Sequence, residues 1–519
     1  MKKIVFYPLL FSIDPLLLLL VGNLSDIPTR KLFPFILVIP LCTAWLFWSL
    51  NRWLRDIYQA GFVTFLITFW FFDYGTVHLF ANILNSGSIP WGSHWVLLPL
   101  WTAVLAFLAS GWVWKKITSP QTITLFLNLV CLLITGYTVF RISMDAVARF
   151  VYDPGAAQDD RASIGFSSTV DSPDIYYIIL DGYARADVLQ ELYHYDNSAF
   201  LEALSDRGFF ISAESQSNYV QTPLSLASSL NMSYLDGLPR SNHERGLLMG
   251  MIRNSKVREL LHAAGYKLVA LSSGYQLTEL TDADYYFSSP HLGKTNDLEG
   301  LLLNNSVAVV LVEQGWLDIP ITHYGQAQER IRYTFASLTN EIPTIDGPKF
   351  VFAHLIAPHP PFIFNQDQPV DPGRFYILVE GGSFTGGSKM YIRDYLGQLT
   401  FVNQQIIQTI DGILANSARP PIIILQGDHG PGAYLDMQSV ENTCLRERFS
   451  ILNAYYLPGG AYHDIPGDIT PVNTFAMILN AYFGSQIQLL ENKQYFSTWN
   501  KPFAFIDVSN KSQLPCDIR

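Results

Sequence analysis

Residues 218–232 read NYVQTPLSLASSLNM, and the pair Thr222-Pro223 within this stretch predicts the start of a helix. Proline is favoured in the first turn of a helix because it has no N–H to lose, and threonine is a good N-cap. A Thr222 hydroxyl at that point would face unpaired backbone N–H groups and the positive end of the helix dipole, where a phosphate or an attacking alkoxide is stabilised. An ordinary N-cap is the alternative interpretation, and residues far away in the sequence weigh against it.

Two apolar runs elsewhere end in residues that can bind metals. IYYIIL at 175–180 runs into Asp181-Gly182, and PIIILQ at 421–426 runs into Gly427-Asp428-His429-Gly430. In an open α/β sheet, ligands gather at the carboxyl ends of the strands, so these side chains are expected to meet. A simple strand-ending turn is the alternative for each motif alone.

The pattern after residue 173 predicts an α/β domain. Short apolar runs alternate with helical patterns, which is typical of a mostly parallel central sheet flanked by helices on both faces. We expect strands at 175–180, 266–271, 350–353 and 421–425, and helices at 197–207, 255–264, 326–338, 389–415 and 471–482.

Two Asp, one His and a Thr oxygen form a mixed oxygen and nitrogen ligand set. Such a set suits one divalent Zn²⁺ or Mn²⁺ ion and tolerates Mg²⁺ or Ca²⁺. The Thr222 hydroxyl would lose its proton more readily beside such a cation, which makes it a nucleophile at neutral pH. The predicted metal ligands are therefore Asp181, Thr222, Asp428 and His429, with Thr222 also the catalytic residue.

A histidine cluster follows the strand predicted at 350–353. The sequence AHLIAPHPPF at 353–362 places His359 between prolines, which fix the backbone around the imidazole. His359 is expected to bind the substrate's phosphoryl oxygens or to protonate a leaving alkoxide, and His354 is a second substrate-binding candidate. The alternative is that these are loop histidines with no role in function. His463 is a weaker candidate for an additional metal ligand or substrate contact.

Residues 1–150 differ in composition from the rest of the chain. They contain ten Lys or Arg, five Asp and no Glu. Five apolar stretches can each cross a bilayer core of ~30 Å, which needs about 20 helical residues. The predicted spans are 5–22, 32–50, 60–84, 94–114 and 122–142. Asp14, Asp73 and His78 lie inside these spans, either as interfacial or as functional groups.

The positively charged loops predict the orientation of these spans. Lys2, Lys3, Arg52, Arg55, Lys115 and Lys116 fall on one side, whereas Arg30 and Lys31 fall on the other. We therefore expect an integral protein of the plasma or inner membrane, with a cytoplasmic N-terminus and an extracytoplasmic C-terminal domain. A cleaved signal peptide is the competing interpretation of the first 22 residues, but no small-residue cleavage site follows Gly22.

The predicted organisation is a transmembrane domain at 1–150, a linker at 151–172 rich in Gly, Ala, Ser and Asp, and a catalytic domain at 173–519. Residues 151–519 carry 23 Lys or Arg against 39 Asp or Glu, a net charge of −16. This excess of negative charge argues against broad binding of nucleic acid. Cys444 and Cys516 are the only thiols of the outer domain, and a disulfide between them is a hypothesis for an oxidising compartment.

In their order and spacing, Asp181, Thr222 opening a helix, the Pro-His-Pro-Pro-Phe loop and Asp428-His429-Gly430 resemble the alkaline phosphatase and sulfatase superfamily. With the spans that precede them, they are most similar to its membrane-anchored branch of lipoteichoic acid synthases and phosphoethanolamine transferases. The resemblance covers about residues 173–485 and ends in Tyr455–Gly459 and Thr470–Thr474. It implies one divalent metal, a phospho-Thr222 intermediate and a substrate contact at His359. Thr222 is followed by Pro-Leu-Ser without an Arg, which departs from the sulfatase motif and disfavours formylglycine chemistry.

The sequence thus favours a metal-dependent transferase that moves a phosphoryl-linked group from a lipid donor to a cell-envelope acceptor. The expected partners are the lipid head group, the acceptor and the membrane. A phosphodiesterase or sulfatase-like hydrolase of the same superfamily is one alternative. A non-catalytic envelope scaffold that retains the fold is the other, because fold alone does not establish function.

Overall fold

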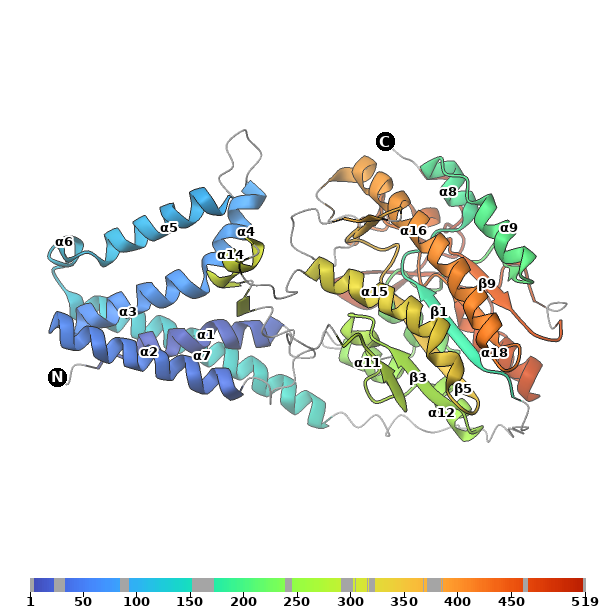
Figure 1. The fold of residues 1–519 in the computed structure, drawn as a ribbon, viewed down its shortest axis with the longest axis horizontal. Helices are drawn as coiled ribbons and strands as arrows, with labels where there is room; N and C mark the ends of the chain where they lie inside the picture. The colour runs from blue at the N-terminus through green and yellow to red at the C-terminus, as the bar shows by residue number, and fades with distance from the viewer. Residues whose placement is uncertain are drawn as a thin grey trace. The chain divides into compact units, whose positions relative to one another are not determined.

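The computed structural model describes residues 4–22, 33–84, 93–151, 172–238, 245–290, 302–303, 305–314, 316, 323–366, 368–370, 384, 386–460 and 465–516. The chain divides into two compact units (Figure 1). The first comprises Met1–Gln158 and Gly293–Ile321, and the second comprises Asp159–Leu292 and Thr322–Arg519. Most of the predicted linker, at 152–171, and His463 lie outside the described residues.

The first unit is built from apolar helices. They are α1 (Tyr7–Gly22), α2 (Phe33–Leu54), α3 (Ile57–Phe72), α4 (Tyr74–Leu84), α5 (His94–Ala109), α6 (Gly111–Trp114), α7 (Pro120–Val151) and the short α14 (Ala308–Glu313). Among the described residues, Pro34–Leu54 and Pro120–Met144 are long and apolar enough to cross a membrane. Three shorter apolar helices cover Tyr7–Leu18, Ile57–Phe72 and His94–Ala109.

The prediction of one continuous span at 60–84 was wrong. The helix α3 ends at Phe72, and Asp73 is its C-cap, with the backbone N–H of Asp73 donating to the Phe69 carbonyl. A new helix, α4, begins at Tyr74. Asp and Gly are poor helix formers, and Asp73 and Gly75 stand together at the break. The polar residue that the sequence placed in mid-span therefore lies at a helix boundary.

Polar side chains join the helices of the first unit where backbone groups would otherwise be unpaired. Asn128 on α7 accepts hydrogen bonds from the N–H groups of Phe6 and Tyr7 at 3.2 and 2.9 Å, and so caps the start of α1. The Thr135 hydroxyl on α7 donates to Asp14 on α1 at 2.6 Å. In an apolar environment such bonds fix the register of two helices, because an unpaired polar group there is costly.

The second unit contains a seven-stranded sheet in the order β2-β9-β8-β1-β5-β3-β4. The strands are β1 (Ile175–Leu180), β2 (Phe210–Ile211), β3 (Lys267–Leu271), β4 (Tyr285–Phe287), β5 (Lys349–Leu355), β8 (Ile422–Gln426) and β9 (Asn453–Tyr456). Strands β8, β1, β5, β3 and β4 run parallel, whereas β9 and β2 pair antiparallel at one edge. The predicted mostly parallel α/β sheet is confirmed.

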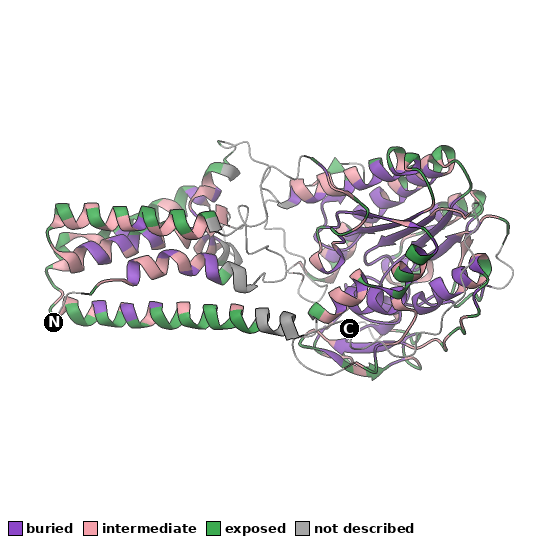
Figure 2. Ribbon diagram, turned by 90° about the horizontal axis from the view of Figure 1, so that it is seen from below, coloured by how far each residue is buried: buried purple, intermediate pink, exposed green. Residues whose placement is uncertain are grey.

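Helices cover both faces of this sheet (Figure 1). Alternate residues of β1 point to opposite faces: Tyr176 and Ile178 belong to one buried cluster, and Tyr177 and Ile179 belong to the other. The helices of the first face are α8 (Ala186–Tyr193), α9 (Ser198–Asp206), α15 (His323–Asn340) and α16 (Gly387–Asn416). Those of the second face are α10 (Thr222–Asn231), α11 (Arg245–Arg253), α12 (Lys256–Ala263) and α18 (Pro471–Phe483). Buried residues concentrate along the strands between the two helical layers (Figure 2).

Smaller elements complete the second unit. They are the hairpins β6 (Phe364–Asn365) with β7 (Gln368–Pro369) and β10 (Tyr495–Thr498) with β11 (Lys501–Asp507), and the short helix α17 (Leu445–Phe449). Cys444 caps α17 and forms a disulfide with Cys516, with the two Cα atoms 5.1 Å apart. The hypothesis of this disulfide is therefore confirmed, and it ties the C-terminal end of the described chain to α17.

Candidate metal centre and catalytic site

The carboxyl ends of three adjacent parallel strands bring the candidate residues together. Strand β1 lies between β5 and β8, and its residue Ile179 is level with His354 on one side and Gln426 on the other. Asp181 is the first residue after β1, and Asp428 comes two residues after the end of β8. The Gly182 N–H donates to Asp428 Oδ1 at 3.1 Å, which links the two strand ends directly.

Thr222 enters this cluster from the start of α10. Its Oγ1 lies 3.0 Å from Nε2 of His429. The Ser225 hydroxyl, one turn further along the helix, donates to the Asp428 carbonyl at 2.7 Å and holds the helix against the loop. The nucleophile candidate and the loop after β8 are thus fixed to each other at two points.

The prediction that Thr222 is the N-cap was off by one residue. Gln221 is the N-cap, with extended backbone, and its carbonyl accepts from the Ser225 N–H at 3.0 Å. Thr222 is therefore the first residue of α10, and its hydroxyl is directed to His429 instead of to the backbone N–H groups of its own helix. The helix start that the sequence predicted is confirmed.

Two distances from His429 Nε2 fit the spacing of ligands around a tetrahedral metal ion, whereas Thr222 Oγ1, at 3.0 Å, lies closer to this nitrogen. Two ligand atoms that each lie about 2.0–2.2 Å from a tetrahedral centre are about 3.3–3.6 Å apart. His429 Nε2 lies 3.5 Å from Asp181 Oδ1 and 3.4 Å from Asp428 Oδ2. Those two carboxylate oxygens are buried and make no hydrogen bond among the described residues. Buried carboxylates need a cation or a donor, so the residues fit a divalent metal.

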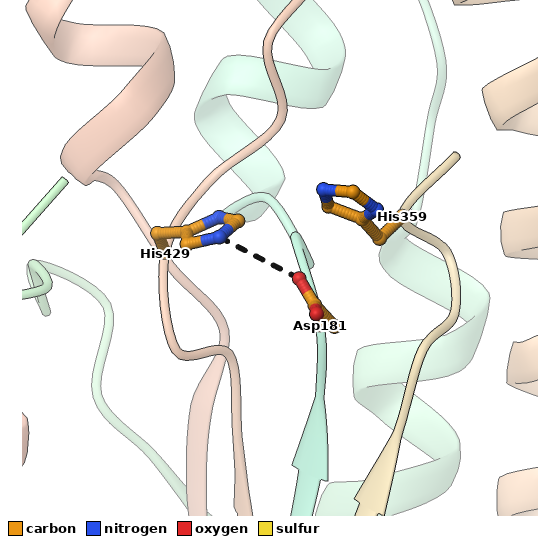
Figure 3. A group of neighbouring side chains, drawn as sticks. All are labelled: Asp181, His359 and His429. Atoms are coloured by element: carbon orange, nitrogen blue, oxygen red, sulfur yellow. Dashed lines mark ion pairs between the residues drawn. The ribbon is translucent and has the colours of Figure 1, made fainter. Parts of the chain in front are cut away.

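The imidazole of His429 is set up to offer Nε2 as a ligand. Its Nδ1 lies 2.9 Å from the Gly430 carbonyl oxygen, and a carbonyl can only accept, so Nδ1 carries the proton. The lone pair then resides on Nε2, which faces Asp181 (Figure 3). A backbone acceptor of this kind is the usual device that orients a metal-binding histidine.

Arg448 on α17 joins the two loops that carry the site. Its Nε donates to the Val220 carbonyl at 2.9 Å, and a terminal nitrogen of the guanidinium donates to the Gly430 carbonyl at 3.0 Å. The Gly430 N–H returns a bond to the Arg448 carbonyl at 2.7 Å. This approach requires glycine, because a Cβ at residue 430 would collide with the Glu447 carbonyl oxygen. The guanidinium is fully buried, so Arg448 acts from inside the fold.

His354 and His359 approach Asp181 from the end of β5 and the loop that follows. His354 Nε2 lies 3.4 Å from Asp181 Oδ2, and its Nδ1 lies 2.9 Å from the Thr278 hydroxyl. The His359 N–H donates to the Asp181 carbonyl at 3.0 Å, and its ring faces that of His429 at a centroid distance of 6.0 Å (Figure 3). His354 is thus directed at the carboxylate, whereas His359 stands opposite His429.

The electrostatics keep Asp181 ionised. Burial by itself would raise the pKa of this carboxyl, but His359, His354 and His429 outweigh it and hold the pKa well below its usual range. Each of two groups of three side chains brings its ligand atoms within 4.8 Å of one another: Asp181 with His359 and His429, and Asp181 with His354 and Asp428. Asp181 is common to both groups, so it lies at the centre of the constellation.

The structure brings together all six residues singled out in the sequence: Asp181, Thr222, His354, His359, Asp428 and His429. It adds three that the sequence did not suggest, namely Ser225, Thr278 and Arg448. Ser225 lies one helical turn after Thr222, a spacing from which it could have been found. No local pattern marks Thr278 or Arg448, which reach the site only through tertiary packing.

Comparison with known proteins gives the family. The sequence model of the family described as Sulfatase matches residues 173–477, more than half of the chain. The chain belongs to the sulfatase family. The resemblance to the alkaline phosphatase and sulfatase superfamily, and the alkaline phosphatase-like fold, are therefore confirmed. A search of curated protein sequences finds no match.

Comparison with solved structures finds matches to this sulfatase-family chain at low sequence identity. The C-terminal periplasmic domain of EcEptC from Escherichia coli, in complex with Zn, is 12% identical, with a TM-score of 0.45; the match covers 68% of this chain and 96% of that domain. The integral membrane protein lipooligosaccharide phosphoethanolamine transferase A from Neisseria meningitidis is 11% identical, with a TM-score of 0.41; the match covers 92% of this chain and 94% of the transferase.

Proposed function

We propose that this chain is a membrane-anchored, metal-dependent transferase that moves a phosphoryl-linked group from a lipid donor to a cell-envelope acceptor. The observation that carries the proposal is the placement of the Thr222 hydroxyl 3.0 Å from His429 Nε2, beside two buried carboxylates. Asp181, Thr222, Asp428 and His429 would hold one divalent metal, with Zn²⁺ or Mn²⁺ favoured and Mg²⁺ or Ca²⁺ tolerated. When bound, the cation supplies Lewis acidity that favours the ionised Thr222 oxygen and offsets charge on the phosphoryl group.

The reaction proceeds in two displacements at phosphorus. In the first, Thr222 Oγ1 loses its proton to solvent and bonds to phosphorus, while the bond from phosphorus to the lipid oxygen breaks. In the second, the hydroxyl oxygen of the acceptor bonds to phosphorus and gives its proton to His359, while the bond from phosphorus to Thr222 Oγ1 breaks and Oγ1 takes a proton from solvent. His359 and His354 contact the phosphoryl oxygens, and His359 donates a proton to the departing lipid oxygen. The start of α10 adds the positive end of its dipole near Oγ1.

The membrane helices support a lipid donor. Tethering a catalytic domain to a bilayer raises the effective concentration of lipid head groups at its site. Phosphoethanolamine, which the name of the Neisseria meningitidis transferase contains, is the first head group to test. The expected location is the plasma or inner membrane, with the N-terminus in the cytoplasm and the catalytic domain outside it.

The test compares Thr222→Ala with Thr339→Ala in the full-length protein. The Thr339 hydroxyl donates to the Phe335 carbonyl of its own helix at 2.9 Å, so it serves as a matched control. We expect Thr222→Ala to keep its fold and to lose turnover and the covalent adduct, which mass spectrometry would place on Thr222 in the unaltered protein. Turnover by Thr222→Ala at the level of the control would remove the nucleophile from the proposal.

Product analysis separates the proposal from its alternatives. A transferase yields a modified acceptor, whereas a phosphodiesterase or sulfatase-like hydrolase releases a free head group. A scaffold would bind no stoichiometric metal at Asp181, Asp428 and His429. Metal analysis of the purified protein therefore distinguishes the enzyme from the scaffold before a substrate is known.

A further inference from the structure

A segment of the first unit comes from the middle of the catalytic part of the sequence. Strand β4 ends at Phe287 and helix α15 begins at His323, and both belong to the second unit. Of the chain between them, 293–321 belongs to the first unit together with α1–α7, and its described residues are 302–303, 305–314 and 316. We call them the returning segment. The chain therefore passes between the two units three times.

The returning segment completes the backbone bonding of a membrane helix. The Val307 N–H donates to the Phe71 carbonyl at 2.8 Å. Phe71 is in the last turn of α3, where carbonyl groups have no partner within the helix. The Thr76 hydroxyl of α4 lies 3.4 Å from the Asn305 side-chain oxygen. These contacts fix the segment to the α3–α4 junction (Figure 1).

Apolar packing extends this contact on both sides. Val309 on α14 is buried in one cluster with Tyr74 and Leu97, and Val307 and Val310 pack against the same cluster. The Tyr74 hydroxyl in turn bonds to His94 Nδ1 at 2.8 Å, which joins α4 to α5 beneath the segment. At the other end, Leu302 packs in a cluster whose further members are Leu16, Phe35, Ile36, Ile39 and Ile142.

The partners of the segment all lie at one end of the helical unit. Leu16 and Ile142 are late in α1 and α7, and Phe71 is late in α3. Phe35 and Leu97 are early in α2 and α5. With successive spans running in opposite directions, these positions share the side that the charged loops predict to be extracytoplasmic. The segment thus contacts the helices on the side where the catalytic domain is expected.

The chemistry of the segment suits the surface of a bilayer. Residues 301–312 read LLLNNSVAVVLV, an uncharged run in a part of the chain whose net charge is −16. Twelve helical residues would span about 18 Å, too short for a bilayer core of ~30 Å. The side chains of Leu311 and Trp316 are 37% and 70% exposed, although other apolar residues of the segment are packed. Tryptophan is enriched where the bilayer meets water.

We propose that the returning segment is a second membrane attachment of the catalytic domain, seated on the outer ends of α1, α2, α3, α5 and α7 with Leu311 and Trp316 in the outer leaflet. It holds the catalytic domain at the lipid surface, so that head groups reach Thr222 from the bilayer. Two attachment points confine a domain more tightly than one flexible linker, which raises the effective concentration of a bilayer donor. This role in turnover rests on the proposed function, whereas the attachment itself does not.

Cysteine cross-linking in native membranes tests the attachment. Thr76→Cys with Asn305→Cys should form a disulfide on mild oxidation, because their side-chain oxygens lie 3.4 Å apart. Thr76→Cys with Trp316→Cys is the matched control and should not, because the Trp316 side chain is 70% exposed and has no contact with Thr76 among the described residues. If Asn305→Cys instead reacts freely with a membrane-impermeant maleimide and does not pair with Thr76→Cys, the attachment is refuted.

Turnover with two donors tests the role of the attachment. Val309→Asp places a charge in the buried contact, and we expect KM for phosphatidylethanolamine in vesicles to rise about tenfold or more, with kcat and turnover of the water-soluble dibutanoyl analogue unchanged. The milder Val309→Ala should raise this KM by a smaller factor and so guards against misfolding. If Val309→Asp lowers turnover equally with both donors, or with neither, the role of the attachment in turnover is overturned. If unaltered protein forms no Thr222 adduct with either donor, the proposed function fails, while the cross-linking result stands.

Discussion

Replacing Arg448 tests whether the metal loop and the helix of the nucleophile are held together from inside the fold. The guanidinium donates to the carbonyls of Val220 and Gly430, and the second of these also accepts from His429. A buried hydrogen bond from a charged group contributes about 1.5–3 kcal/mol, so Arg448→Met should destabilise the second unit by about 3 kcal/mol or more. For some 330 residues this lowers Tm by about 4 °C or more.

Replacing Arg448 should affect metal affinity more strongly than stability. Loss of a group that orients a ligand typically lowers metal affinity about 10–100-fold, and we expect this range for Arg448→Met. Arg448→Lys keeps the positive charge but lacks the planar guanidinium with its several N–H donors, so it should lower the metal affinity by a smaller factor. Arg446→Met is the matched control, because Arg446 lies on the same helix and pairs with Glu191 near the surface, where an ion pair contributes about 1 kcal/mol or less.

The assay is a Zn²⁺ titration of the chelator-treated full-length protein against a competing dye, with thermal unfolding in parallel. An Arg448→Met protein that binds Zn²⁺ as tightly as the Arg446→Met control would refute the role of Arg448 in holding His429. A fall in Tm without a fall in metal affinity would reduce Arg448 to a structural residue.

Three further predictions concern stability and metal. Burial raises the pKa of Glu447 to about 7. The protonated carboxyl therefore contributes to the free energy of unfolding below pH ~4.5, and this contribution declines as the pH rises through 7. Glu447→Gln should remove this part of the pH dependence of Tm between pH 5 and 8. Serine at both Cys444 and Cys516, which are 72 residues apart, should cost about 4 kcal/mol in urea unfolding, with Cys42→Ser unchanged. Chelation should abolish turnover and lower Tm, and Zn²⁺ should restore both; turnover that survives full chelation would contradict a metal-dependent site.

The strands and helices of the second unit could be predicted where the apolar pattern was long enough. The run at 175–180 forms β1 without a shift, and the helix predicted at 389–415 is α16 at Gly387–Asn416. Strands β2 and β4 have two and three residues, too few for a period to show in the sequence. The position of short edge strands is set by pairing with neighbours, which local propensity does not encode.

The residues of the candidate site also fall into those that the sequence could predict and those that it could not. Asp181 and Asp428-His429 could be predicted because residues that bind metals follow two apolar runs at the carboxyl ends of strands, and Thr222 could be predicted because Pro223 marks a helix start. Arg448 lies 226 positions after Thr222, on a short helix, and its buried contacts are with backbone carbonyls, which leave no mark in a sequence. The partner of the Thr222 hydroxyl also differs from the predicted one. The hydroxyl lies 3.0 Å from the buried imidazole of His429, which competes with the N–H groups of the helix.

Two separate features of the described residues bear on the predicted topology of the chain, whose orientation stays a prediction. A disulfide persists in an oxidising compartment, and Cys444–Cys516 belongs to the second unit. The returning segment leaves that unit and contacts the ends of α1, α2, α3, α5 and α7 that the charged loops assign to the same compartment. The first argument rests on redox chemistry and the second on packing, so neither depends on the other. The disulfide bears on the compartment, whereas the packing places only the returning segment and these helix ends on one common side; a catalytic domain on the cytoplasmic side would require the disulfide to resist reduction.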